Sequence, residues 1–172
     1  MCKKENRMGN SIVPTLVLSA QKKEGLFKTL TVFVIIYENK TIISYLTPER
    51  QKAENKKIEE KLKQEKKGFL KSSNEMMRFW AHYHERFLTK SAEEVLAEDS
   101  KNFEILHMNI DKVSFSPKRD DVFTEDGSNA GTLGKFKIVV GDIKYEFTHQ
   151  YEKNQKLVYD LTEIFGEKLK VK

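Results

Sequence analysis

The stretch GKFKIVVGDIKYEF, residues 134–147, decides the fold because its pattern predicts a tight antiparallel hairpin. Apolar and aromatic residues alternate with polar or smaller ones on both sides of Gly141-Asp142, a dipeptide suited to a two-residue turn. The turn fixes the register and predicts three cross-strand pairs. These pairs are Val140 with Ile143, Ile138 with Tyr145, and Phe136 with Phe147. Because strand side chains alternate between faces, we expect all six on the core side of the hairpin.

Strand character also dominates residues 15–47, where β-branched and aromatic residues are frequent. Three segments carry it: TLVLSA (15–20), LFKTLTVFVIIY (26–37) and TIISYLT (41–47). Polar turns at residues 21–25 and 38–40 separate these segments, so we expect three consecutive strands in a meander. Strand character returns in FEILHMNIDKVSF, residues 103–115, ahead of the hairpin.

The residues between these two groups of strands predict helices. Thr47 is a favourable N-cap, Pro48 suits the first helical position, and the lysine- and glutamate-rich run that follows is expected to end at Gly68. Two further helix starts have the serine-to-glutamate spacing of a capping box. These are Ser72 with Glu75 and Ser91 with Glu94. We therefore expect a helical insertion at about residues 48–101.

A last amphipathic helix is predicted from about Asn154. Its apolar face, at helical spacing, consists of Leu157, Leu161, Ile164 and Phe165. Strands and helices together predict an α+β fold. The 172 residues are enough for a single domain, residues 1–172, with one core.

Composition narrows the functional classes. The single cysteine, Cys2, leaves no disulfide framework and no cysteine-based zinc site, which favours a cytoplasmic location. The first residues do not read as a secretion signal. The longest apolar run, LTVFVIIY at residues 30–37, is too short for a transmembrane segment. A net charge of +5 suits anionic partners, although lysine-rich sequences commonly have such a value.

The stretch FWAHYHERF, residues 79–87, holds the only tryptophan and two of the four histidines. On a helix, His82 and His84 would diverge by about 200° and could not bind one metal ion. His84 instead falls within an apolar arc, so we interpret it as an imidazole at the edge of the core. The arc consists of Met76, Met77, Trp80, Tyr83, Phe87 and Leu88. A hydrolase that uses His84, with acidic residues brought near by the fold, is a weaker alternative.

The loop GSNAGTLGKF, residues 127–136, lacks the requirements of a phosphate-binding P-loop. A P-loop needs Ser or Thr after Gly-Lys and then a helix, whereas Phe136 and a strand follow here. The neighbouring carboxylates do not have the spacing of a calcium loop. They are Asp120, Asp121, Glu125 and Asp126. Because no nucleophile motif is recognisable either, we expect a protein that is not an enzyme and has no catalytic residue, metal or cofactor.

The first inserted helix combines a narrow apolar stripe with a basic face. The stripe consists of Ile58, Leu62 and Phe69, and the basic face of Lys52, Lys56, Lys63, Lys66 and Lys67. Residues 49–71 contain nine basic and five acidic side chains, which suits contact with anionic lipid or nucleic acid. We favour a solvated face, because Glu59 and Glu60 interrupt the lysines. The lack of interleaved aromatic residues argues against nucleic acid.

The order of these elements resembles the pleckstrin-homology-like superfamily. Three pieces of sequence carry a narrower resemblance, to a functionally uncharacterised prokaryotic branch related to GRAM and bacterial pleckstrin-homology domains. They are VFVIIYENKTIISYLTPE (32–49), SAEEVLAEDSKNFEILHMNIDKV (91–113) and GKFKIVVGDIKYEF (134–147) with the closing helix. The resemblance implies a bent antiparallel β-barrel, capped at one end by the C-terminal helix, with the other helices inserted between strands.

The resemblance also implies a binding scaffold. Some members bind phosphoinositide headgroups at the open end of the barrel, and others bind peptides. By this resemblance the loop QKKEGLFK, residues 21–28, carries the ligand-facing Lys22, Lys23 and Lys28. We expect a non-enzymatic binding module, cytoplasmic and peripheral at the membrane, whose partner is an anionic lipid surface. The alternative is a protein-interaction or assembly module in which the inserted helices present their apolar stripe to a partner.

Overall fold

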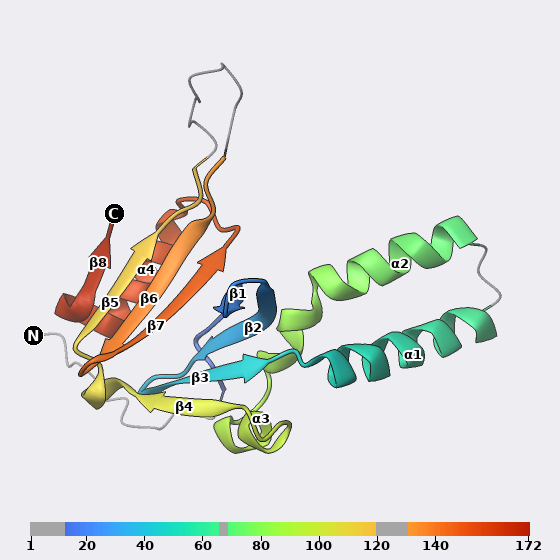
Figure 1. Cartoon of the computed structure of the whole chain (residues 1–172), viewed down its shortest axis with the longest axis horizontal. Helices are drawn as coiled ribbons and strands as arrows, with labels where there is room; N and C mark the ends of the chain where they lie inside the picture. The colour runs from blue at the N-terminus through green and yellow to red at the C-terminus, as the bar shows by residue number, and fades with distance from the viewer. Residues whose placement is uncertain (1–12, 66–68, 120–130) are drawn as a thin grey trace, which may run out of the picture.

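The computed structural model describes residues 13–65, 69–119 and 131–172, with Phe69 described by its backbone only. This part of the chain forms one eight-stranded sheet, in the order β4-β3-β2-β1-β7-β6-β5-β8, with four α-helices (Figure 1). Neighbouring strands are antiparallel except β5 and β8, which are parallel. The α+β class is confirmed. The sheet is nevertheless mixed, and it is not closed into a barrel because β4 and β8 remain its edges.

The elements follow the predicted order, with additional short pieces. Before the insertion lie β1 (Leu16–Glu24), β2 (Lys28–Ile36) and β3 (Lys40–Tyr45). The insertion consists of α1 (Pro48–Gln64), α2 (Phe69–Ala81), the 3₁₀ helix η1 (Tyr83–Phe87) and α3 (Ala92–Ala97). After it come β4 (Phe103–Leu106), η2 (His107–Asn109), β5 (Lys112–Ser116), β6 (Gly134–Val140), β7 (Ile143–His149), α4 (Gln155–Phe165), η3 (Gly166–Lys168) and β8 (Leu169–Val171).

The β6–β7 hairpin has the predicted register. All three expected pairs are present, and Gly141 adopts a φ of 54° in the turn. The expected core face is only partly buried, because the hairpin extends beyond the core at its turn. Phe136, Ile138 and Phe147 are buried, whereas Ile143, beside the turn, is exposed.

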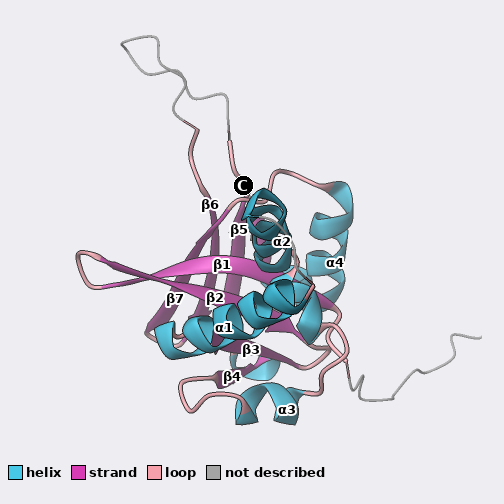
Figure 2. Ribbon diagram, turned by 90° about the vertical axis from the view of Figure 1, so that its right-hand side faces the viewer, coloured by secondary structure: helices cyan, strands magenta, loops and turns pink. Residues whose placement is uncertain are grey.

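The β1–β2 hairpin is longer than predicted. The polar residues 21–24 continue β1 instead of forming a turn, and Glu24 still pairs with Lys28. The turn is therefore confined to residues 25–27, where Gly25 adopts a φ of 71°. Figure 2 shows this hairpin projecting at the left, on the opposite side of the molecule from α4.

One face of the sheet packs against α4. Leu157, Leu161 and Phe165 lie on the predicted apolar face of this helix and are buried in a cluster that includes Phe136 and Phe147. The helix begins where the sequence predicts, because the Asn154 side chain accepts hydrogen bonds from the backbone amides of the first turn. Strands from before and after the insertion thus share one core, which α4 covers.

The opposite face of β1–β3 is also apolar, and η1 and α3 cover it. The Phe33 ring on β2 lies 5.0 Å from the Phe87 ring and 5.6 Å from the Tyr83 ring of η1, measured between centroids. Val95 of α3 is buried in the same cluster. Burial on both faces explains the unbroken apolar run in β2, because a strand covered on both sides has no need of polar alternation.

Within the insertion, two of the three predicted helix starts are confirmed. The Thr47 side chain accepts a hydrogen bond from the Arg50 amide, with Pro48 following the cap, and Ser91 forms a capping box with Glu94. The start at Ser72 is wrong, since α2 already begins at Phe69 and runs through Ser72. The predicted end at Gly68 lies outside the described residues. FWAHYHERF is not one helix either, because α2 ends at Ala81 and η1 follows.

A cluster of ion pairs joins the separate pieces of the insertion. Glu98, next to α3, pairs with Arg50 of α1, Arg86 of η1 and Lys90. Burial alone would raise the pKa of Glu98, but the hydrogen bond from Lys90 and the charges of Arg50 and Arg86 outweigh this effect and lower the pKa. The carboxylate therefore stabilises the folded state in its charged form.

We predict that Glu98→Gln lowers the free energy of unfolding at pH 7 by about 2 kcal/mol, because three cations lose a half-buried, charged partner. The folded-state pKa of Glu98 lies below its unfolded value, so its contribution is present above the unfolded pKa and is lost as the pH falls through the folded one. Urea denaturation should show the difference from wild type shrinking in acid. Glu104→Gln removes an exposed ion pair with Lys40 and serves as the control, with an expected loss below about 1 kcal/mol. A difference that does not depend on pH would contradict this role.

Candidate functional site

The predicted ligand loop forms the projecting end of the β1–β2 hairpin. Its turn exposes two large apolar side chains almost completely, Leu26 at 90% and Phe27 at 98%. Exposed apolar residues are common on protein surfaces when they are scattered, but two adjacent ones at a projecting tip point to a contact surface. The sequence prediction named only the lysines of this loop and missed the apolar pair.

The three lysines of this hairpin do not converge on one ligand. Lys22 lies against β3, where its Nζ donates a hydrogen bond to the Tyr45 hydroxyl at 2.6 Å. Lys28 lies beside the tip, with its Nζ 3.4 Å from a carboxylate oxygen of Glu24. Lys23 is exposed, and strand alternation places it on the opposite face of the hairpin from Lys22. Lys23 and Lys28 thus flank the apolar tip, whereas Lys22 is set back from it.

The helical insertion projects as a hairpin of α1 and α2 (Figure 1). The predicted apolar stripe is used within this hairpin, since Leu62 is buried, Ile58 is half-buried, and the Trp80 indole donates a hydrogen bond to the Asn55 side chain. The predicted basic residues Lys52, Lys56 and Lys63 are exposed. Lys66, Lys67 and the Phe69 side chain lie outside the described part. No helix in the described ranges is long and apolar enough to cross a bilayer.

Within this hairpin, α2 leaves some of its apolar side chains exposed. Leu70 is 78% exposed, and Met77, two helical turns further along, is 63% exposed. A hollow of about 400 Å³ lies between the two helices near Met77. Its lining consists of Glu59, Leu62, Lys63, Ser72, Ser73, Met76 and Met77.

The two neighbouring histidines occupy different environments. His82 is exposed, and its Nδ1 lies 2.6 Å from a carboxylate oxygen of Glu85. His84 is half-buried and lines two adjoining hollows beside β1. The carboxylates around the loop at residues 120–126 lie outside the described residues, as does the first part of the glycine-rich loop, residues 127–130. Lys135 and Phe136 belong to β6.

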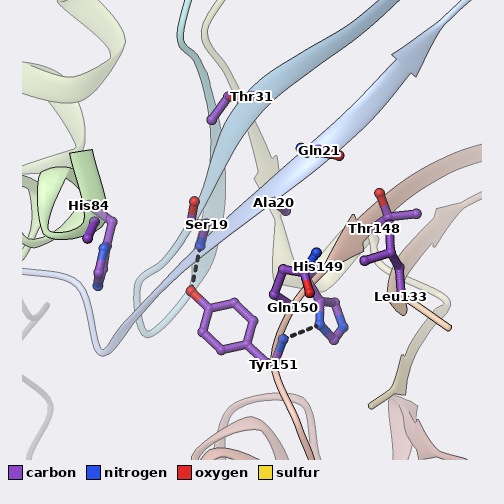
Figure 3. A pocket seen from close by; sticks show the side chains of 11 residues that line it. Ser19, Ala20, Gln21, Thr31, His84, Leu133, Thr148, His149, Gln150 and Tyr151 are labelled. Atoms are coloured by element: carbon purple, nitrogen blue, oxygen red, sulfur yellow. Dashed lines mark hydrogen bonds between the residues drawn. The ribbon is translucent and has the colours of Figure 1, made fainter. Parts of the chain in front are cut away.

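A cavity of about 360 Å³ lies at the seam where β1 meets β7 (Figure 3). The two strands are neighbours in the sheet but share a single register pair, Gln21 with Thr148. Beyond that pair β7 ends, and the Ser19 backbone amide donates a hydrogen bond of 2.8 Å to the Tyr151 hydroxyl in place of a strand partner. The cavity is lined by Ser19, Ala20, Gln21, Thr31, Ala81, His84, Leu133, Thr148, His149, Gln150 and Tyr151.

His149 forms part of the floor of this seam cavity. It is only 3% exposed, its ring stacks on Phe115 with centroids 5.0 Å apart, and its Nδ1 accepts a hydrogen bond from the Tyr151 amide. Its Nε2 has no hydrogen-bond partner among the described residues. Burial lowers the pKa of His149, so the imidazole is neutral at physiological pH. The sequence prediction missed His149, although continued alternation along β7 places it on the same face as Phe147.

Gly134 is required by the position of this imidazole. A Cβ atom at residue 134 would lie 2.1 Å from Cε1 of His149. We predict that Gly134→Ala lowers the free energy of unfolding by about 1–3 kcal/mol because the ring must shift. His149→Ala should relieve the clash, so that the double variant loses less than the sum of the two single variants in urea denaturation. Strictly additive losses would contradict a clash between these two residues.

Comparisons of the chain with models of protein families, with curated proteins and with solved structures found no match. Three features of the described residues are candidate sites: the exposed tip of the β1–β2 hairpin, the seam cavity between β1 and β7, and the exposed apolar face of α2.

Proposed function

We propose that this protein is a non-enzymatic module that docks on anionic lipid surfaces through the tip of its β1–β2 hairpin. The scaffold we propose for it is a pleckstrin-homology-like fold of the GRAM-like kind. Two features support that scaffold: β1–β4 and β5–β7 are each consecutive neighbours in the sheet, and the C-terminal helix α4 packs on their shared core. The exposure of Leu26 and Phe27 between lysines is the observation that carries the docking proposal.

The tip carries apolar side chains that suit the apolar part of a lipid surface and basic side chains that suit its anionic headgroups. Burying one large apolar side chain contributes about 1.5–3 kcal/mol, and each lysine near an anionic membrane about 1 kcal/mol. Leu26 and Phe27 would enter the interface while Lys23 and Lys28 remain at the level of the headgroups. Lys28 can exchange its exposed contact with Glu24 for a lipid phosphate at little cost, because exposed ion pairs are weak. Such a contact gives reversible, salt-sensitive docking.

We predict that the protein sediments with vesicles of phosphatidylcholine mixed with phosphatidylglycerol, and much less with phosphatidylcholine alone. Leu26→Ser with Phe27→Ser should weaken this binding at least about tenfold, because the apolar contribution is lost. Lys23→Gln with Lys28→Gln should weaken it less and reduce its dependence on salt. Met108→Ser, which removes an exposed apolar side chain outside the hairpin, and Lys144→Gln are the matched controls. Equal binding to neutral vesicles, or a tip variant that binds like wild type, would refute the proposal.

Assembly through α2 is a second candidate function, and the exposure of Leu70 and Met77 favours it. Positions two turns apart lie on one face of a helix, as expected for a face that packs against another helix. Ile58 and Leu62, the stripe expected from the sequence to meet a partner, are at least half-buried inside the α1–α2 hairpin. The occupant we propose for the α2 face is therefore the α2 face of a second copy of the chain.

Light scattering over a concentration series should show a reversible dimer of the wild-type protein if this second candidate is right. Leu70→Lys with Met77→Lys should then be monomeric, because charges would have to be buried in the contact. Met108→Lys introduces the same change at another exposed apolar residue and should leave the dimer intact. A wild-type monomer at every concentration would exclude assembly through this face.

A further inference from the structure

The seam cavity between β1 and β7 lies apart from the hairpin tip and carries a different chemistry. We propose that it is a binding site for a neutral, hydroxyl-rich ring, the chemistry of an uncharged sugar. The site is independent of lipid docking by the tip, since none of Lys23, Leu26, Phe27 and Lys28 lines it.

Polar side chains without a protein hydrogen-bond partner among the described residues line the cavity. Its lining contains hydroxyl groups, carboxamides and one half-buried imidazole, supplied by Ser19, Thr31, Thr148, Gln21, Gln150 and His84. Within the described residues, none of these side chains makes a hydrogen bond to another protein group; Gln21 and Gln150 are exposed, and the other four are half-buried. They come from β1, β2, η1, β7 and the residue that follows β7, so no single element supplies this lining (Figure 3).

The charge of the lining excludes most other small ligands. Among the residues that the structure describes, no aspartate, glutamate, lysine or arginine lines this cavity, in a chain where such residues make up 33% of the sequence. A phosphate, carboxylate or ammonium group placed here would lose its hydration without a compensating charge, which is unfavourable. The cavity therefore selects ligands without formal charge.

The pattern of donors and acceptors favours hydroxyl groups on the ligand. Hydroxyl and carboxamide side chains each both donate and accept, so a ligand that only accepts or only donates would leave part of the lining unpaired. Burial raises the pKa of Tyr151, which keeps its hydroxyl protonated. That oxygen already accepts from the Ser19 amide, and its own proton remains free to be donated to a ligand. Ring hydroxyls of a sugar both donate and accept, as this lining requires.

Size and shape agree with one sugar ring. The volume of about 360 Å³ falls within the range of small-ligand sites, at its lower end. Ala20, Ala81 and Leu133 supply apolar patches in the wall. A sugar presents apolar C–H faces between its hydroxyl groups, so a mixed wall of this kind fits it better than a wholly polar one.

Saturation-transfer difference NMR with glucose, galactose, N-acetylglucosamine and myo-inositol tests the site. We expect at least one of these neutral probes to bind at millimolar concentration, and the phosphate ester of glucose to bind at least about tenfold more weakly. Thr31→Val and Thr148→Val remove a lining hydroxyl and keep the β-branched shape, and each should weaken binding about fivefold. Thr29→Val, at an exposed position of the same strand β2, is the matched control and should bind like wild type.

Vesicles distinguish a free sugar from a lipid headgroup. If the source is a headgroup, phosphatidylcholine vesicles that contain a neutral galactolipid should capture the wild-type protein, and should capture Thr148→Val about fivefold more weakly. Binding of free galactose without vesicle capture would assign the site to soluble sugars. The Leu26→Ser, Phe27→Ser protein should keep its sugar binding, so failure of tip docking and failure of the cavity are separable. The proposal is wrong if no neutral probe binds, or if the phosphate ester binds as well as glucose.

Discussion

The two-sided burial of β2 is the constraint on which the rest of the structure depends. Val32, Val34 and Ile36 face the core that α4 covers, while Phe33 and Ile35 face the insertion. A strand that is apolar on both faces cannot border water on either side. The chain after β3 must therefore return over the outer face, and η1 and α3 do so, held to α1 through Glu98. The α1–α2 hairpin is not needed to cover this face, and it projects from the sheet.

Incomplete cover of the outer face explains why a cavity forms at the seam. The inserted helices pack over β1–β3, and β7 separates from β1 beyond Gln21 and Thr148. As a result, the Ser19 backbone amide lacks a hydrogen-bond acceptor on β7. It donates its hydrogen bond to the Tyr151 hydroxyl instead. The space between η1 and the end of β7 stays concave because no side chain of the described ranges fills it. The cavity is thus a consequence of how two halves of one sheet are joined.

The sequence prediction was correct mostly where a feature depends on one hairpin or one helix alone. Gly141-Asp142 fixed the β6–β7 register, and Thr47, Ser91 and Asn154 marked helix starts correctly because each cap acts on its own first turn. Ser72 failed as a start because a cap signal is also compatible with a helix interior when neighbouring residues favour the helix. The polar run Gln21–Glu24 failed as a turn because pairing with β2 outweighs the composition of an exposed arm.

The candidate sites were less predictable because they depend on distances between elements. Nothing in the local sequence links Ser19 to Tyr151, since this contact arises only when β1 meets the end of β7. The contact between Gly134 and His149 follows only when the predicted β6–β7 register is continued by one more pair. The β1–β2 hairpin then connects the two candidate sites through one rigid element. Gln21 and Thr31 of the cavity are register partners, and Glu24 and Lys28 close the same ladder about 10 Å away. With the tip in a membrane interface, the cavity would lie just outside the headgroup layer, which is about 5–8 Å deep on each side of the bilayer. A sugar that extends from a lipid could reach it there, whereas a phosphate close to the glycerol could not.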